Sequence, residues 1–419
     1  MNSRSRVLAA LQHKEPDKLP IDLSAMRSTG IMALAYHDLR NHLGLSEKDK
    51  IRVYDIIQQL AMPEDKVLEL FEVDAIDFSR VFWNSPEDWS NFKLSNGTEV
   101  EVPSAYDITY TNGKYVAKSS DGTVIAQKPE SVIYFNQTCH PLADMFEGKL
   151  KDDEFVHLKD YLEKVMWVKL PTPPSHLPFT KENLAYIRKK AKQLYEQTDY
   201  AILSGVGGNF FEMGQFLYRS DNLFMELLTN PKRVEKLLDK LLELYLENMK
   251  EFLEAIGDYV QILVAGDDLG TQQASLISPK LYRDIFKPRH KEMFDFIKKH
   301  SNCYIFFHSC GAIYDHIPDL IEAGVDILNP VQKSASNMDI RRLKKEFGKD
   351  LTFWGGGCDT QHILPHGSIS EVEDDVKKSI DILAKDGGFV FTQVHNITAG
   401  VPPENIVTMF NTANEHGRR

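Results

Sequence analysis

The sequence predicts an α/β protein built as a single (β/α)8 TIM barrel that carries one antiparallel β insertion. Short apolar stretches alternate with amphipathic helical stretches along most of the 419 residues, a pattern typical of parallel α/β proteins. The strand-like stretches number eight, as a closed barrel of this type requires, and such barrels reach this length when they carry insertions. One segment departs from the alternation and contains hairpin-turn sequences instead.

The predicted strands are short runs that are rich in apolar and β-branched residues. In chain order they cover residues 19–24, 73–78, 200–204, 260–264, 303–307, 325–328, 351–354 and 388–392. The clearest helical stretch covers residues 231–256. Its apolar side chains recur at helical spacing opposite a Glu/Lys face, which predicts core packing. Pro231 and Pro279 mark the starts of two helices, since proline is favoured at the first helical position.

The predicted insertion covers residues 84–174 within a barrel domain that spans residues 1–419. Its three turn signals are Asn96-Gly97, Asn112-Gly113 and Asp121-Gly122, dipeptides that favour the positive φ of tight hairpins. Helical and linker sequence follows, to about residue 174. We expect the insertion to lie over or beside the barrel mouth.

Charge and composition exclude several classes of function. The chain has 49 Lys+Arg and 61 Asp+Glu, a formal net charge of -12, which disfavours a nucleic-acid partner. The apolar run from Val7 to Leu11 is too short for a signal-peptide core. No run of eighteen apolar residues exists, so we expect no membrane partner. Free thiols suit a reducing compartment, and we expect a cytoplasmic location.

A candidate zinc site follows two of the predicted strands. His308 and Cys310 come directly after one apolar run, and alternate residues of an extended chain share a face. Cys358 follows three glycines after another run, where the backbone bends freely. One imidazole and two thiolates suit zinc, and three protein ligands leave a fourth position for chemistry. Two alternatives remain: small buried cysteines without a metal, and a structural zinc site, which normally has four protein ligands.

Other polar residues at the carboxyl ends of the predicted strands converge on the same mouth if the barrel closes. They are Asp22, Arg27, Asp77, Glu212, Asp267, Asp268, Asn329, Gln393 and His395. We assign catalytic roles to Asp267, Glu212 and His395, and substrate contacts to Asn329, Gln393 and Arg27.

Each of the three catalytic assignments has an alternative. Asp267 or Asp268 either completes the metal shell or orients His308, but an aspartate after a strand also serves as a helix N-cap. Glu212 is either a displaceable fourth ligand or a base, and solvent exposure is equally compatible with its position. His395 either faces a substrate or is a hydrogen-bonded structural residue.

Several common catalytic motifs are absent from the sequence. It has no Gly-x-Ser-x-Gly elbow, no Walker loop and no Gly-x-Gly-x-x-Gly fingerprint. Serine hydrolase, P-loop and dinucleotide-dependent dehydrogenase functions are therefore excluded as interpretations.

Five short segments resemble the uroporphyrinogen decarboxylase superfamily. They are Lys18-Leu19-Pro20-Ile21-Asp22, Ala25-Met26-Arg27-Ser28-Thr29-Gly30, Phe307-His308-Ser309-Cys310-Gly311, Ile327-Leu328-Asn329-Pro330 and Pro402-Pro403-Glu404-Asn405-Ile406. The resemblance covers essentially the whole chain except the insertion, and it implies a single (β/α)8 barrel.

The superfamily contains metal-free tetrapyrrole decarboxylases, which have an arginine-rich entry motif, and cobamide-dependent methyltransferases, which bind zinc through a His-x-Cys pair and a distant cysteine. Here the entry region has only Arg27, and His308, Cys310 and Cys358 match the zinc ligands in type and order. The resemblance therefore implies the methyltransferase branch.

We accordingly predict a zinc-dependent methyltransferase that moves a methyl group between a small methylated donor, of the O-methyl ether or methylamine type, and a corrinoid. Zinc would act as a Lewis acid on the heteroatom that carries the methyl group. The chain lacks the Asp-x-His-x-x-Gly signature of corrinoid carriers, so a separate carrier protein would supply the corrinoid. The alternative is a metal-free decarboxylase of the uroporphyrinogen type.

Overall fold

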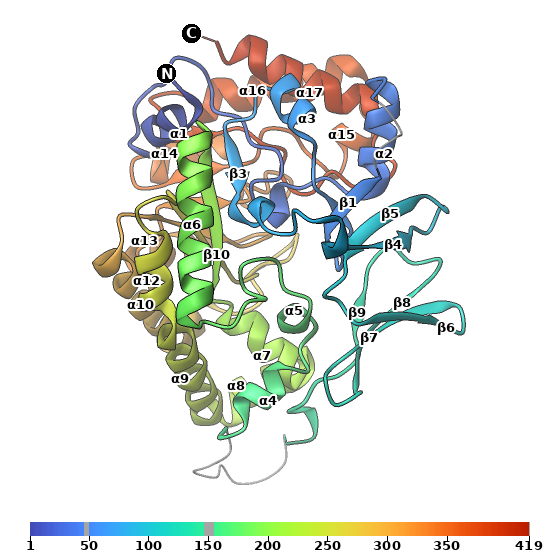
Figure 1. The fold of residues 1–419 in the computed structure, drawn as a ribbon. Coiled ribbons are helices and arrows are strands. Elements are labelled where there is room, and N and C mark those ends of the chain that lie inside the picture. The colour runs from blue at the N-terminus through green and yellow to red at the C-terminus, as the bar shows by residue number, and fades with distance from the viewer. Residues whose placement is uncertain (46–49, 146–154, 419) are drawn as a thin grey trace.

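A seven-stranded parallel sheet forms the centre of the fold. The computed structural model describes residues 1–45, 50–145 and 155–418 (Figure 1). The strand order is β15-β14-β13-β12-β11-β10-β3, and every neighbouring pair is parallel. The strands are β3 (Ala75–Asp77), β10 (Ala201–Gly207), β11 (Ile262–Gly266), β12 (Tyr304–His308), β13 (Ile327–Asn329), β14 (Thr352–Trp354) and β15 (Phe389–Val390). Seven of the eight predicted strands therefore lie where the sequence placed them.

The eighth predicted strand, at residues 19–24, makes only single-residue bridges. Ile21 bridges Phe391, directly after β15, and Asp22 bridges Ala75 of β3, both in parallel orientation. The segment thus touches both edge strands of the sheet. Pro20 has no N–H to donate, and Ser24 has φ 68°, so regular pairing does not extend along the segment.

The helices lie mainly in the connections between the parallel strands, as the alternating sequence predicts. They are α1 (Ser3–Leu11), α2 (Ala33–His42), α3 (Asp65–Leu70), α4 (Leu158–Leu162), α5 (Met166–Lys169), α6 (Lys181–Gln197), α7 (Phe210–Tyr218), α8 (Ser220–Thr229), α9 (Pro231–Glu247), α10 (Met249–Ile256), α11 (Pro279–Leu281), α12 (Lys287–His300), α13 (Ile317–Ala323), α14 (Ile340–Phe347), α15 (Ile363–His366), α16 (Ile369–Leu383) and α17 (Pro403–His416). Within the described ranges, none of them combines the length and the apolar character that a membrane crossing needs.

Two helix predictions are tested by these boundaries. Pro231 and Pro279 both begin helices, and the side chain of Ser278 accepts a hydrogen bond from the N–H of Leu281 at 3.2 Å. The stretch 231–256 is not one helix, however. At Asn248 (φ −112°, ψ 1°) the backbone leaves helical geometry, which separates α9 from α10, although buried apolar residues continue at helical spacing on both sides.

Two small sheets pack beside the parallel sheet and contain the predicted hairpins (Figure 1). Antiparallel pairing occurs around all three predicted turns, and Gly97, Gly113 and Gly122 have φ of 90°, 76° and 84°. The strands are β1 (Ile51–Asp55), β2 (Leu60–Ala61), β4 (Trp89–Lys93), β5 (Glu99–Pro103), β6 (Ile108–Thr111), β7 (Lys114–Lys118), β8 (Val124–Pro129) and β9 (Asn136–Gln137). β1 and β2 precede the predicted insertion, and its residues 146–154 lie outside the described ranges.

Alternate residues of the parallel strands divide the core into two clusters. One cluster contains the side chains on one face of the strands. It also includes residues of α1, together with Ala25 and Met26, which follow the bridging residues Ile21 and Asp22. Its buried members are Val7, Ala10, Leu11, Ala25, Met26, Ala75, Ala201, Leu203, Ile262, Phe306, Ile327, Trp354 and Val390. The opposite face packs against the helices in the larger cluster. The strand ends are thereby held in fixed register around a solid interior.

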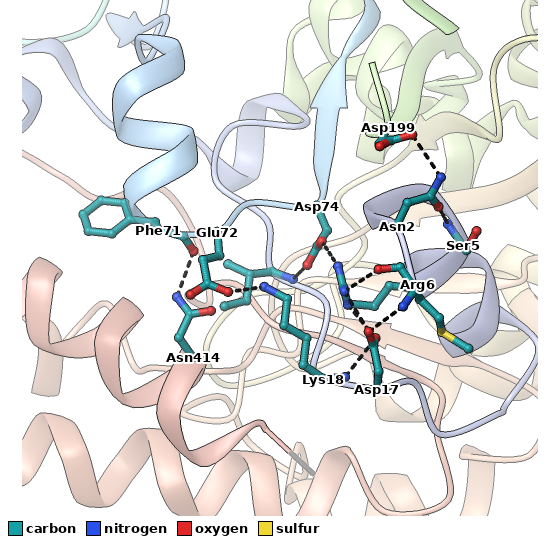
Figure 2. A network of polar contacts seen from close by, with 12 residues as sticks. Asn2, Ser5, Arg6, Asp17, Lys18, Phe71, Glu72, Asp74, Asp199 and Asn414 are labelled. Carbon is teal, nitrogen blue, oxygen red and sulfur yellow. Dashed lines mark hydrogen bonds and ion pairs between the residues drawn. The ribbon is translucent and has the colours of Figure 1, made fainter. Parts of the chain in front are cut away.

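An ion-pair network joins the first helix to the start of β3 (Figure 2). Arg6 donates from Nη1 to Oδ1 of Asp74 at 2.6 Å and from Nε to Oδ1 of Asp17 at 2.8 Å. The other oxygen of Asp74 accepts from the N–H of Ile21 at 3.0 Å. Asp74 is 1% exposed and Arg6 7%, so this pair is buried. The network ties together α1, the bridging segment and β3.

Replacement of Arg6 by methionine tests this network. We expect the free energy of unfolding to fall by about 3–5 kcal/mol, because Asp74 would remain buried without its charged partner. Urea denaturation measures the change. The exposed ion pair of Lys280 with Asp284 provides the control, and Lys280→Met should cost less than about 1 kcal/mol. An Arg6→Met protein within 1 kcal/mol of the wild type would contradict the assigned role of the network.

Candidate metal centre

Three potential metal ligands meet at the carboxyl ends of β12 and β15. His308 ends β12, Cys310 follows two residues later, and His395 lies five residues beyond β15. One ligand atom from each lies within 4.8 Å of the others, and Sγ of Cys310 lies 3.4 Å from Nε2 of His308. The two imidazole rings have centroids 5.7 Å apart. All three side chains are partly exposed, so a ligand from solvent has access to them.

Close backbone packing fixes the turn that contains Cys310. Gly311 has φ 89°, and a Cβ there would lie 2.5 Å from the carbonyl carbon of Gly270. A Cβ at Gly266 would lie 2.8 Å from the backbone oxygen of His308. Only glycine fits at both positions, since no other residue tolerates such contacts. The loops after β11 and β12 are therefore held against each other.

Cys358, expected as the third ligand, is not part of this cluster. Its backbone oxygen accepts from the N–H of Val394 at 2.9 Å, beside His395, but its side chain is fully buried. Burial raises the pKa of the Cys358 thiol, and the carboxylate of Asp375 in α16 raises it further. Gly355 and Gly356, at φ 99° and 81°, turn the chain so that the side chain faces α16. The structure brings His395 to the other two residues instead.

Carboxyl groups surround the thiol of Cys310. Oδ1 of Asp268 accepts from the N–H of Cys310 at 2.8 Å and lies 3.5 Å from Nε2 of His308. Burial raises the pKa of the Cys310 thiol well above its usual range, and Asp268 and Glu212 raise it further. Burial likewise raises the pKa of Glu212, followed by the charges of Asp268 and Asp267. In the described ranges, Asp267 and Asp268 form ion pairs only with histidines, and a divalent cation would compensate the negative charge of the site.

Asp267 has a different place from the one we expected for a catalytic group. It is fully buried, and its two oxygens accept from the N–H groups of Phe211 and Glu212 at 2.7 and 2.8 Å. His290 lies 3.5 Å away. Asp267 thus stabilises the amino terminus of α7, which carries Glu212, and Asp268 is the aspartate that faces the cluster. This arrangement resembles the N-cap alternative. The helix that Asp267 stabilises is α7, however, which follows β10, whereas Asp267 itself follows β11.

The protonation of His395 suits a metal ligand. Burial and, to a smaller extent, the neighbouring His308 lower the pKa of His395 to about 4. Its ring is therefore neutral near pH 7 and retains a lone pair for a cation. Glu212, in the first turn of α7, is partly buried and accepts from Nδ2 of Asn209 at 3.0 Å. It lies close enough to Cys310 to act on the charge of the site.

The three residues expected to contact substrate divide into two groups. Asn329 and Gln393 are fully buried, and both amides are used within the protein. Asn329 bonds His308, as described below, and Gln393 donates from Nε2 to the oxygen of Thr29 at 2.9 Å. Arg27 keeps 28% of its side chain exposed, while its Nε lies 2.7 Å from Asp55 and its guanidinium stacks over Trp167. Arg27 alone of the three remains accessible.

Some residues of this region carry no clear sequence signal. Asp55 and Trp167 meet Arg27 from segments without motifs. His395 follows the last predicted strand, as His308 follows another strand. Nothing in the sequence marked His395 as a metal ligand, however, and we expected it to face a substrate.

Comparisons with known proteins agree with this fold. A family model described as uroporphyrinogen decarboxylase (URO-D) matches residues 109–416. Among solved structures, a methyltransferase from Methanosarcina mazei is similar with a TM-score of 0.56 and 16% identity, covering 99% of each chain. A D-psicose 3-epimerase has a TM-score of 0.30 and 12% identity, covering 57% of this chain and 82% of its own. No curated protein matches the sequence. At 16% identity the likeness to the methyltransferase concerns the fold alone.

Asp22, which bridges Ala75 of β3, gives a pH-dependent test of the structure. It accepts from Nε1 of Trp354 at 2.7 Å and from the N–H of Ala25 at 2.8 Å, yet burial raises its pKa to about 7. A pKa raised on folding contributes stability below about pH 4, the unfolded pKa, and this contribution is lost as the pH rises toward 7.

We therefore expect the wild type to lose stability relative to Asp22→Asn between pH 4 and 7, since asparagine does not ionise. Urea unfolding at a series of pH values measures the difference. Parallel stability curves for the two proteins would contradict a buried, proton-binding Asp22.

Proposed function

Because the chain belongs to the uroporphyrinogen decarboxylase family, we propose that it is a zinc-dependent methyltransferase acting between a small methylated donor and a corrinoid protein. The observation that carries this proposal is the accessible cluster of His308, Cys310 and His395. Nitrogen and sulfur ligands suit zinc, and three protein ligands are the usual number in catalytic zinc sites. A closed structural site would have four protein ligands.

We further propose that the parallel sheet closes into an eight-stranded barrel in a single domain, with the segment 84–174 as its insertion. The bridges of Ile21 to Phe391 and of Asp22 to Ala75 support closure, since they link the two edge strands. The metal ligands then lie at the carboxyl ends of the strands, where barrel enzymes place their active sites.

The residues around the cluster have separable tasks. His308, Cys310 and His395 would hold the ion, and Asp268 and Glu212 would offset its charge. Bound zinc supplies Lewis acidity, which makes the heteroatom of an O-methyl ether or methylamine a better leaving group. Arg27, at the accessible edge, would contact the donor. The partial exposure of all three ligands gives the donor and a methyl acceptor a route to the site.

The corrinoid would arrive on a separate carrier protein, because the chain has no Asp-x-His-x-x-Gly segment with which to bind one. We place the docking face at the mouth, beside the two small sheets. The four cysteines within the described ranges are free thiols, which fits a cytoplasmic location.

The alternative is a metal-free decarboxylase of the uroporphyrinogen type. Its substrate carries several carboxylates, but the entry turn offers only Arg27, whose Nε is already paired with Asp55. The carboxyl groups around Cys310 would also repel an anionic substrate. The methyltransferase is therefore the better-supported function.

Zinc content after dialysis distinguishes the ligand set. We expect about one zinc per chain in the wild type and in Cys358→Ala, since the Cys358 side chain faces α16. Cys310→Ala and His395→Ala should lose most of the metal, because each removes one of three ligands. Atomic absorption gives the stoichiometry. Loss of zinc in Cys358→Ala with retention in His395→Ala would reverse the assignment.

Methyl transfer tests the activity itself. The zinc-loaded protein, mixed with a reduced corrinoid protein and a panel of methyl ethers and methylamines, should produce methylcobalamin, which is followed by absorbance. Cys310→Ala should lower the rate at least 100-fold, since removal of an electrophilic group typically costs about 10²–10³ in rate. Conversion of uroporphyrinogen by the metal-free protein, without methyl transfer, would favour the decarboxylase.

A further inference from the structure

We propose that the turn η1 (Arg27–Thr29) is a positioning element for both imidazoles of the metal centre, and that Ser28 is its main side-chain contact. This inference rests on the proposed metal site. It assigns a role to a segment of which the sequence singled out only Arg27. Two independent sets of hydrogen bonds connect the turn to His308 and to the loop of His395.

The first set of bonds fixes the ring of His308. Oδ1 of Asn329 lies 2.7 Å from Nδ1 of His308 and 2.6 Å from Oγ of Ser28. Nδ2 of Asn329 donates to the backbone oxygen of Trp354 at 2.8 Å, which determines which end of the amide is the oxygen. An amide oxygen only accepts, so Nδ1 of His308 carries the proton. Its Nε2 then presents a lone pair toward Cys310 and Asp268.

Ser28 contributes to this arrangement by occupying the second lone pair of Asn329. Its hydroxyl also lies 2.6 Å from Sδ of Met26, but it has a single proton, and an amide oxygen is a stronger acceptor than a thioether. Ser28 is 4% exposed and Asn329 fully buried, so water does not replace either group. Metal-binding histidines generally depend on such an outer partner for ring orientation.

The second set of bonds fixes the loop that carries His395. Gly30, directly after the turn, donates to Oδ1 of Asn396 at 3.2 Å and accepts from the N–H of Ile397 at 3.0 Å. Gln393 donates from Nε2 to the backbone oxygen of Thr29 at 2.9 Å. The residues on both sides of His395 are therefore held by the turn and by the residue that follows it. A displacement of the turn would move both imidazoles.

The test compares zinc affinity with the stability of the metal-free protein. The variants are Ser28→Ala, Ser28→Thr and Asn329→Leu, with Ser90→Ala, an exposed serine of β4, as the matched control. Zinc affinity is measured by competition with a chromophoric chelator. The thermal midpoint of each metal-free protein is measured alongside, because a merely structural role would appear there.

We expect Ser28→Ala to weaken zinc binding about three- to tenfold, the value of one neutral hydrogen bond. Asn329→Leu should weaken it about 10- to 100-fold, as loss of an outer partner of a metal-binding histidine does. Ser28→Thr, which retains the hydroxyl, should restore most of the wild-type affinity, and Ser90→Ala should leave it unchanged. The metal-free midpoint of Ser28→Ala should remain close to that of the wild type.

Two results would overturn the inference in distinguishable ways. Wild-type zinc affinity in Ser28→Ala, with or without a lowered metal-free midpoint, would show that the turn does not position the ligands, while the metal centre stands. Absence of zinc binding by the wild type itself would remove the metal centre and, with it, this inference.

Discussion

The acidic side chains around the partly exposed thiol of Cys310 are the constraint on which the candidate site depends. Asp268 and Glu212 lie close enough to Cys310 to raise the pKa of its thiol, and Asp267 acts in turn on Glu212. In the described part of the chain, the ion pairs of Asp267 and Asp268 are with histidines. Folding desolvates these groups, and buried charge is costly unless it is compensated. Under the proposed function, a divalent cation bound by His308, Cys310 and His395 would provide compensation that no lysine or arginine of the described ranges supplies there. The same acids would then increase the affinity of the proposed site for a metal.

The fold supports this arrangement by holding several loops in one register. Parallel pairing places His308 opposite Gly266 and Asn329, so the ends of three neighbouring strands meet at the cluster. Asp267 stabilises the amino terminus of α7 and thereby fixes Glu212. The solid interior below, which includes Trp354, keeps these strand ends from moving relative to one another. Chemistry at the mouth thus rests on packing and hydrogen bonds deeper in the sheet.

Periodicity was sufficient to predict the parallel strands, and the turn dipeptides predicted the hairpins, because both signals are local. The strands β1 and β2 were not predicted, and β1 pairs with β5, which lies far along the chain. The break at Asn248 was also not predicted, because the apolar residues recur at helical spacing on both sides of it. Strand alternation correctly brought His308 and Cys310 together. It did not place Cys358, because the positive φ of Gly355 and Gly356 decides where that side chain points, and sequence gives no measure of it. His395, like His308, lies at the carboxyl end of a parallel strand, and these ends meet at the same edge of the sheet.

The zinc-edge X-ray absorption spectrum of the loaded wild-type protein tests the central claim most directly. The account predicts a single sulfur scatterer at about 2.3 Å together with at least two imidazole nitrogens at about 2.0–2.1 Å. The remaining scatterers should be light atoms from water or a carboxylate. A spectrum with two sulfur ligands would place Cys358 on the metal in addition to Cys310, and would contradict the cluster that the structure assembles.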